Sequence, residues 1–271
     1  MAKPLTPNQS IAMGQLAALI ETLRGQNGCP WDKKQTPNTM TRYLIEEVYE
    51  LVDAILAEDA QAVCEEAGDV LFQLLFVIRL FEEAGHFGLA DVVENNRVKM
   101  VRRHPHVFGD CIAKTPQTVS ENWEKIKRAE KRTHKDRSVL SSIPRSLPAL
   151  ARAAMVSERA AKTGFDWDDI SGVMAKTMEE WQEFAREVNP GQGVAAGPEA
   201  AMEFGDVLFT MVNVARFAHI HPETALIQSI QKFEKRFNFM QEKAEAAGRD
   251  FNSLTAQEMQ GLWDAAKGVI S

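Results

Sequence analysis

The chain has 271 residues, enough to bury one large hydrophobic core or two modest ones. A hydrophobic fraction of 45% and a charged fraction of 25% are ordinary for a globular protein, and the net charge of −7 argues against nucleic acid as the main partner. The three cysteines form no C-x-x-C pair, which favours inert thiols in a reducing cytoplasm. The N-terminus has no apolar signal core, and the most apolar run, 70–81, is shorter than the roughly 20 residues of a membrane span. We therefore expect a cytoplasmic protein with no membrane partner.

The first informative element is a predicted helix over residues 44–55. Its apolar residues recur at the spacing of one helical stripe: Leu44, Ile45, Val48, Leu51, Val52 and Ile55. At roughly 100° per residue, Glu47 lies at the border of that stripe and Glu50 just beyond it, whereas Glu46 points further towards solvent. Residues three apart share a helix face, so Glu47 and Glu50 form a carboxylate pair.

A second helix is predicted over residues 63–81, and we expect it to be central because it is apolar on most sides. Glu66 and Asp69 interrupt this apolar surface, again three residues apart. Buried carboxylates are costly without a partner, and four of them repel one another unless cations lie between them. Hard cations prefer oxygen ligands, so the pattern favours Mg²⁺, with Mn²⁺ as a substitute, over salt bridges or a merely solvated helix face.

Basic and aromatic residues follow the acids along the chain. Lys99 and Arg103 are four apart on one predicted helix face, a spacing that suits a solvated face, an ion pair or the phosphates of a nucleotide. Trp123 and Lys127 likewise share a face, which fits either base stacking or a core tryptophan with a lysine extending past it. The basic stretch 125–137 contains no aromatic residue for stacking, so we interpret it as a solvated helix end.

The whole series recurs in the second half of the chain, in the same order. The second copy follows the first by 133 to 140 positions and comprises Glu180, Glu183, Glu203, Asp206, Lys232, Arg236, Trp263 and Lys267. Ahead of the acids, Trp167 in the second copy likewise corresponds to Trp31 in the first. No alternating strand pattern is present, so the sequence predicts an all-α fold of two tandem modules, residues 1–137 and 151–271. Pro144 and Pro148 interrupt any helix in the predicted linker between them, 138–150.

The connection between the two acidic helices differs between the copies. Residues 189–198 form a glycine-containing loop in the second copy, whereas the counterpart 57–65 is shorter and has neither glycine nor proline. Neither a P-loop nor a G-x-S-x-G nucleophile motif is present. Glu83-x-x-His86 has no second copy, which argues against a di-iron site. The remaining route to hydrolysis is a water nucleophile activated by a metal ion.

These motifs resemble the MazG-type nucleoside triphosphate pyrophosphohydrolases. The family motif, E-E-x-x-E followed after a spacer by E-x-x-D, stands here as EEVYE (46–50) with EAGD (66–69) and as EEWQE (179–183) with EFGD (203–206). The segments NGCPWD, RRHPHVF, IPRSLPAL and GFDW also look like two-module members, so the resemblance covers nearly all of the chain. It implies MazG-like helical bundles, similar to dimeric all-α dUTPases and phosphoribosyl-ATP pyrophosphatases, that assemble as homodimers or higher oligomers.

The resemblance also implies an activity and the residues that carry it. Members cleave nucleoside triphosphates between the α and β phosphates with Mg²⁺, giving NMP and pyrophosphate, in nucleotide-pool control. Carried over, the metal-binding acids are Glu47, Glu50, Glu66, Asp69, Glu180, Glu183, Glu203 and Asp206. Of these, the catalytic acids are Glu47 and the four of the second module. The nucleotide contacts are Lys99, Arg103, Trp123, Lys127, Lys176, Lys232, Arg236, Trp263 and Lys267. Glu46 and Glu179 are the candidate general bases, because each adjoins a ligand but is turned by about 100° around the helix.

Two other functions stay open at this point. Tyr43 stands where the second module has Lys176, so the first module is also consistent with a regulatory module that binds nucleotide without turnover. A purely structural helical scaffold is the other alternative. In two-module relatives the second module is often the active one, and we expect the same here.

Overall fold

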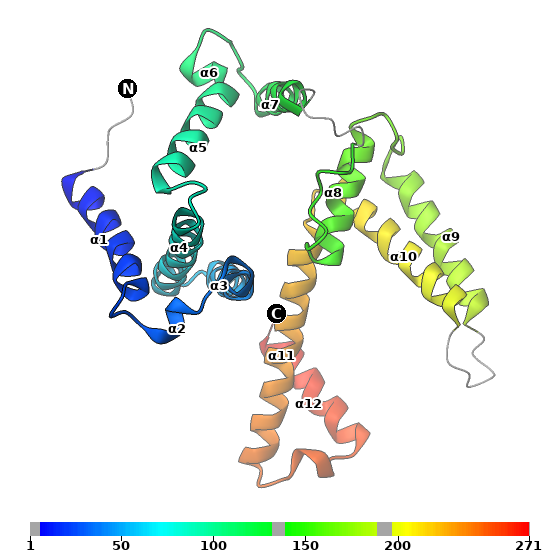
Figure 1. Ribbon diagram of the computed structural model, residues 1–271. Coiled ribbons are helices and arrows are strands. Elements are labelled where there is room, and N and C mark those ends of the chain that lie inside the picture. The colour runs from blue at the N-terminus through cyan, green and yellow to red at the C-terminus, as the bar shows by residue number, and fades with distance from the viewer. Residues whose placement is uncertain (1–5, 132–138, 189–196, 271) are drawn as a thin grey trace. The chain divides into compact units, whose positions relative to one another are not determined.

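The computed structural model describes residues 6–131, 139–188 and 197–270, and within these ranges every regular element is a helix. The chain divides into two units, Met1–His134 and Lys135–Ser271 (Figure 1). The helices of the first unit are α1 (Pro7–Arg24), α2 (Pro30–Lys33), α3 (Pro37–Leu56), α4 (Ala60–Glu83), α5 (Leu89–Arg103), α6 (Pro105–Phe108) and α7 (Pro116–Lys131). Those of the second are α8 (Ala149–Ala161), α9 (Ile170–Glu187), α10 (Pro198–Phe217), α11 (Pro222–Ala246), the short 3-10 helix η1 (Phe251–Ser253) and α12 (Ala256–Val269). The all-α prediction is confirmed.

Membrane-spanning character is lacking in the described helices: none of them combines the length and the apolar composition that crossing a bilayer requires. The most apolar stretch of the sequence belongs instead to α4, which packs against other helices of its own unit.

Polar caps and prolines define where the helices begin. Thr6, Thr36 and Thr255 each accept a hydrogen bond from the backbone N–H three residues further on and belong to capping boxes. Asp59 caps α4 and Asp169 caps α9 with a side-chain oxygen. Proline occupies the first position of α3 and of α10, where its missing N–H costs no helical hydrogen bond. These local signals fix the starts of the helices that carry the acids.

Each unit contains one hairpin of two long helices, α3 with α4 and α9 with α10 (Figure 1). Residues 57–59 join the first pair in a tight turn, in which Glu58 adopts a left-handed φ of 56°. The loop predicted over 189–198 connects the second pair, and its residues 189–196 lie outside the described residues. The hairpins matter for function because they bring both carboxylate pairs of each unit onto neighbouring helices.

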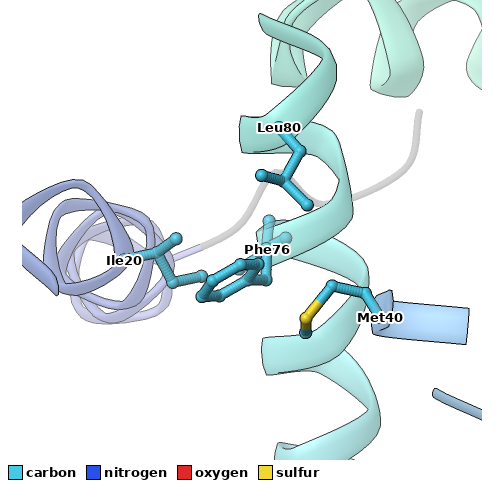
Figure 2. Packing of buried hydrophobic residues seen from close by; sticks show 5 residues of the cluster. Ile20, Met40, Phe76 and Leu80 are labelled. Atoms are coloured by element: carbon cyan, nitrogen blue, oxygen red, sulfur yellow. The ribbon is translucent and has the colours of Figure 1, made fainter. Parts of the chain in front are cut away.

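The core of the first unit forms where α1, α3 and α4 meet. Ile20 of α1 and Met40 of α3 pack against Phe76 and Leu80 of α4 (Figure 2). Ile20, Met40 and Phe76 are each at most 1% exposed. This places α4 at the centre, as its apolar surface predicts, although Leu74 on another side of the helix is exposed.

The second unit has a polar pair at the corresponding place, where the first has isoleucine and phenylalanine. Ser157 of α8 and Asn213 of α10 are both buried, and the Ser157 hydroxyl donates a hydrogen bond to Asn213 Oδ1. Arg216 Nε donates to Ser157 Oγ at 2.7 Å, and its guanidinium forms an ion pair with Asp166. Every polar group of this buried cluster therefore has a partner, which is what makes its burial tolerable.

The segment predicted as a linker packs onto α8. Ile143 is buried, and Arg159 of α8 donates hydrogen bonds to the Val139 carbonyl at 3.2 Å and to Ser142 Oγ at 2.6 Å. Pro148 occupies the N-cap position of α8 and makes no side-chain capping hydrogen bond there. The described part of this segment thus belongs to the second unit. Of the basic stretch, residues 132–137 lie outside the described residues.

Candidate functional site

Three of the four acids predicted in the first unit come together. Glu47 on α3 and Glu66 and Asp69 on α4 offer carboxylate oxygens that all lie within 4.8 Å of one another. We call this trio the first acidic group. Glu50, one turn after Glu47, is exposed and lies outside the trio, yet its charge acts on Glu66.

A corresponding trio forms in the second unit but with a different third member. Glu180 and Glu183 on α9 and Glu203 on α10 offer carboxylate oxygens within 4.8 Å of one another, and we call them the second acidic group. Glu180 is buried, with 8% of its surface exposed. Asp206 is exposed and lies outside the trio, although its charge acts on Glu203.

The pKa is raised for three of the acids, two in the first group and one in the second. Burial, with the neighbouring carboxylates of Asp69 and Glu50, raises the pKa of Glu47 above its ordinary value, against a lowering hydrogen bond from Gln73. Burial and neighbouring carboxylates likewise raise the pKa of Glu66 and of Glu203. Carboxylates held together at such a cost favour a cation between them.

The first glutamate of each group holds a different partner. Glu47 Oε1 accepts a hydrogen bond from Gln73 Nε2 of α4 at 3.3 Å. Glu180 Oε1 lies 2.8 Å from the ammonium of Lys176, one turn earlier on α9. The carboxylates of Glu180 and Glu179 raise the pKa of Lys176, so this side chain is a fixed cation. Tyr43, the counterpart of Lys176, instead packs edge-on against Trp31 with ring centroids 5.4 Å apart.

The two candidate general bases each lie beside a cation and outside the acidic groups. Arg42 Nε donates to Glu46 at 2.7 Å, and Lys176 donates to Glu179 at 2.9 Å. Both glutamates are exposed. In each case the cation contacts one carboxylate oxygen, Oε1.

The predicted arginine and tryptophan of each unit pack against each other. Arg103 lies over the Trp123 ring at 5.3 Å and forms an ion pair with Glu130 at 2.6 Å. Arg236 lies over the Trp263 ring at 5.8 Å and donates to the Ile270 carbonyl at 2.7 Å. These pairs tie α5 to α7 and α11 to α12, and such a cation–π contact stabilises the packing of the terminal helix.

The four predicted lysines on these helices are less constrained. Lys99 and Lys127 are half-buried, whereas Lys232 and Lys267 are exposed. Lys267 forms an ion pair with Asp264 at 2.9 Å. Within the described ranges, no hydrogen bond or ion pair joins these basic residues to either acidic group. The sequence repeat placed them in the same order as the acids, but the structure holds them on separate helix pairs.

The donor atoms of both acidic groups suit a hard divalent cation. Among the described residues, neither group includes a histidine or cysteine, the ligands that zinc prefers. Gln73 contacts the first group through its amide nitrogen, which donates to Glu47, and its amide oxygen is buried and accepts no hydrogen bond within the described residues. Sequence reasoning missed Gln73 as a site residue. Its position four residues after Asp69, in the otherwise apolar run 70–78, was the available signal.

A family model described as the MazG nucleotide pyrophosphohydrolase domain matches residues 35–108 and 169–239. The chain belongs to the MazG family. It is 39% identical over 258 residues to the Nucleoside triphosphate pyrophosphohydrolase/pyrophosphatase MazG of Thermotoga maritima, covering 95% of this chain and 96% of that protein. It is also 39% identical to the Nucleoside triphosphate pyrophosphohydrolase of Escherichia coli strain K12, covering 93% of this chain and 96% of that one. The Uncharacterized protein YabN of Bacillus subtilis strain 168 is 46% identical over 92% of this chain, which spans 50% of that protein.

Both MazG domains enclose an acidic hairpin and the basic pair that follows it. The first domain match spans α3 to α6 and the second spans α9, α10 and most of α11. The terminal helices α7 and α12, with Trp123 and Trp263, lie beyond the matched ranges. The resemblance to the family and the presence of two MazG-like copies are thus confirmed.

Proposed function

We propose that this MazG-family chain is a nucleoside triphosphate pyrophosphohydrolase, a hydrolase that converts NTP or dNTP to the monophosphate and pyrophosphate. The observation that carries the proposal is the trio of carboxylates, with oxygens within 4.8 Å of one another, on the helical hairpin of each MazG domain. Relatives that match over nearly their whole length carry the same activity in their names, which supports the assignment.

The acids are proposed to bind Mg²⁺, with Mn²⁺ as a substitute. When bound, the cation would supply positive charge that offsets the charge of the phosphates and activates a water nucleophile. Glu50 and Asp206, each three residues from a member of its group, are proposed as further residues that would hold the cation. Glu46 and Glu179 are proposed to accept the proton of the attacking water after Arg42 and Lys176 turn to the phosphates.

The basic and aromatic residues are proposed to bind the rest of the nucleotide. The exposed ammonium groups of Lys232 and Lys267, and those of Lys99 and Lys127, suit phosphate oxygens as point charges. Arg103 and Arg236 position the rings of Trp123 and Trp263, which offer a face for base stacking. Nucleoside triphosphates are a cytoplasmic pool, so a cytoplasmic location is part of the proposal.

Exposed apolar stripes support a homodimer or higher homo-oligomer. Met174, Met178 and Trp181 follow one face of α9 and are each about half exposed (52%, 58% and 49%). Phe204, Leu208 and Met211 form a similar exposed stripe on α10. Apolar surface of this extent is typical of an interface. Light scattering after gel filtration tests this, and a monomer at micromolar concentration would contradict it.

Product analysis tests the activity. Incubation with each NTP and dNTP plus Mg²⁺ should yield pyrophosphate and the monophosphate, and release of orthophosphate and a diphosphate would contradict the cleavage position. The double variant Glu47→Ala with Glu180→Ala should lose turnover while circular dichroism shows unchanged helicity. Glu121→Ala with Glu234→Ala, which removes two exposed glutamates from α7 and α11, is the matched control and should retain full turnover.

A further inference from the structure

Glu47 and Glu180 occupy equivalent positions in the two MazG domains, yet their immediate partners differ in charge. Glu47 Oε1 accepts a hydrogen bond from the neutral amide of Gln73 at 3.3 Å. Glu180 Oε1 lies 2.8 Å from the Lys176 ammonium. A cation entering the first acidic group therefore meets uncompensated carboxylates, whereas one entering the second competes with an ammonium already in place.

Gln73 provides an independent indication that the first group takes a ligand. The residue is 8% exposed, and its amide oxygen is buried without a donor in the described part of the chain. Buried polar atoms normally have a partner, so an orphan oxygen on the amide whose nitrogen reaches Glu47 indicates a missing partner, such as a cation or its hydration shell. Thr210 stands at this position in the second unit and donates its hydroxyl to the Asp206 and Val207 carbonyls, at 3.0 Å each.

The local surroundings keep the two sites distinct. Arg42 forms its ion pair with Glu46, and Tyr43 packs against Trp31, so among the described residues no cation is paired with Glu47 as Lys176 is with Glu180. Lys176 contacts both Glu180 and Glu179. Phosphate oxygens offer an ammonium an alternative partner of higher charge, so a triphosphate can release Glu180.

We propose that the first acidic group binds a divalent cation without nucleotide, with Gln73 as the positioning residue of Glu47, whereas the second binds one tightly only together with a triphosphate that draws Lys176 away from Glu180. The second half of this statement rests on the proposed function, because it takes the phosphates of the substrate as the trigger. The first half concerns the cation alone. The first unit thereby binds its cation in the absence of substrate, and the second binds its cation only together with the substrate.

Mn²⁺ binding to the full-length chain, measured by electron paramagnetic resonance without nucleotide, tests both halves. One tight class of site is expected. Gln73→Met and Glu47→Gln should weaken this class about 10-fold or more, as loss of a group that orients a ligand commonly does, whereas Glu180→Gln should leave it unchanged. Lys176→Met, or a non-hydrolysable triphosphate added to the wild type, should produce a second class of comparable affinity.

Matched variants control for position and fold. Thr210→Val, at the equivalent place in the second unit, should leave the tight class unchanged, and Lys176→Arg should retain a single class because it keeps the cation. Gln73→Thr installs the residue of the second unit and serves if Gln73→Met does not fold. Two equal classes in the wild type, loss of the tight class in Glu180→Gln, or no Mn²⁺ binding would overturn the inference. Turnover is assayed separately, so asymmetric binding without hydrolysis refutes the proposed function alone.

Discussion

The two acidic groups are built from the same motif but do not contain the same acids. Both include the second glutamate of the E-E-x-x-E motif and the glutamate of the E-x-x-D motif, Glu47 with Glu66 and Glu180 with Glu203. The third member is Asp69 in one unit and Glu183 in the other. Equivalent motifs thus place equivalent residues on the helices, while the packing between the helices decides which carboxylates meet.

The buried cores of the two units also differ, because one is apolar and the other contains a polar cluster. The first unit buries Ile20 against Phe76, and the second buries Ser157 against Asn213 with Arg216 as a further partner. An apolar core is stabilised in proportion to the area it removes from water, whereas a polar core depends on every hydrogen bond being made. The second unit therefore relies more on specific geometry than the first.

Substitution of one glutamate in each acidic group, in separate variants, tests which unit performs the hydrolysis. Glu180→Gln should reduce pyrophosphate release by at least about 100-fold, because it removes a ligand and also the partner of Lys176. Glu47→Gln should cause a smaller loss, since we expect the second unit to be the active one. Steady-state kinetics measure both, and the reverse order would assign the chemistry to the first unit.

The contrast between the two cores predicts unequal losses of stability. Phe76→Ala removes a side chain with 0% exposure and should lower the free energy of unfolding by about 3–5 kcal/mol. Asn213→Ala leaves Ser157 and Arg216 without one partner and should cost about 1–3 kcal/mol. Urea denaturation followed by circular dichroism measures both. Equal losses would show that the polar core is as tightly packed as the apolar one.

The raised pKa values of Glu47, Glu66 and Glu203 predict how pH acts on both groups. Groups whose pKa is higher in the folded than in the unfolded state bind protons more readily when folded, so their contribution to stability improves as the pH falls. Protons then compete with the cation. The increase in melting temperature caused by Mn²⁺ should shrink as the pH falls from neutral. This decrease should begin at a pH above the ordinary pKa of glutamate. A cation effect that is constant over this range would contradict the placement of the cation at these acids.

The smallest expected effect concerns an exposed ion pair found beside the first group. Arg42 and Glu46 have 77% and 45% of their side-chain surface exposed, and such pairs contribute little because water screens them. Arg42→Ala should leave the melting temperature unchanged within error in differential scanning calorimetry. A clear decrease would indicate that Arg42 has a packing role in addition to its contact with Glu46.

The sequence determined the helices, the repeat, the family and the eight acids that could form a cation site. Helix periodicity and capping residues such as Thr36 and Asp169 are local, so they can be read without the fold. The contact between Lys176 and Glu180 is also local, because residues four apart on one helix are neighbours. The identity of the third acid in each group was not available, since it depends on the rotation of one helix against the other.

Only the tertiary structure decided what lies opposite Glu47. Gln73 is 26 residues away on a different helix, and its position in the sequence shows only a polar residue in an apolar run. The hairpin turn and the packing of Phe76 against Ile20 and Met40 set the register of α4, which presents Gln73 to Glu47. The sequence therefore determined that two sets of acids exist. The packing of α3 on α4 and of α9 on α10 decided that the two sets differ, because contacts between helices depend on their relative rotation and register.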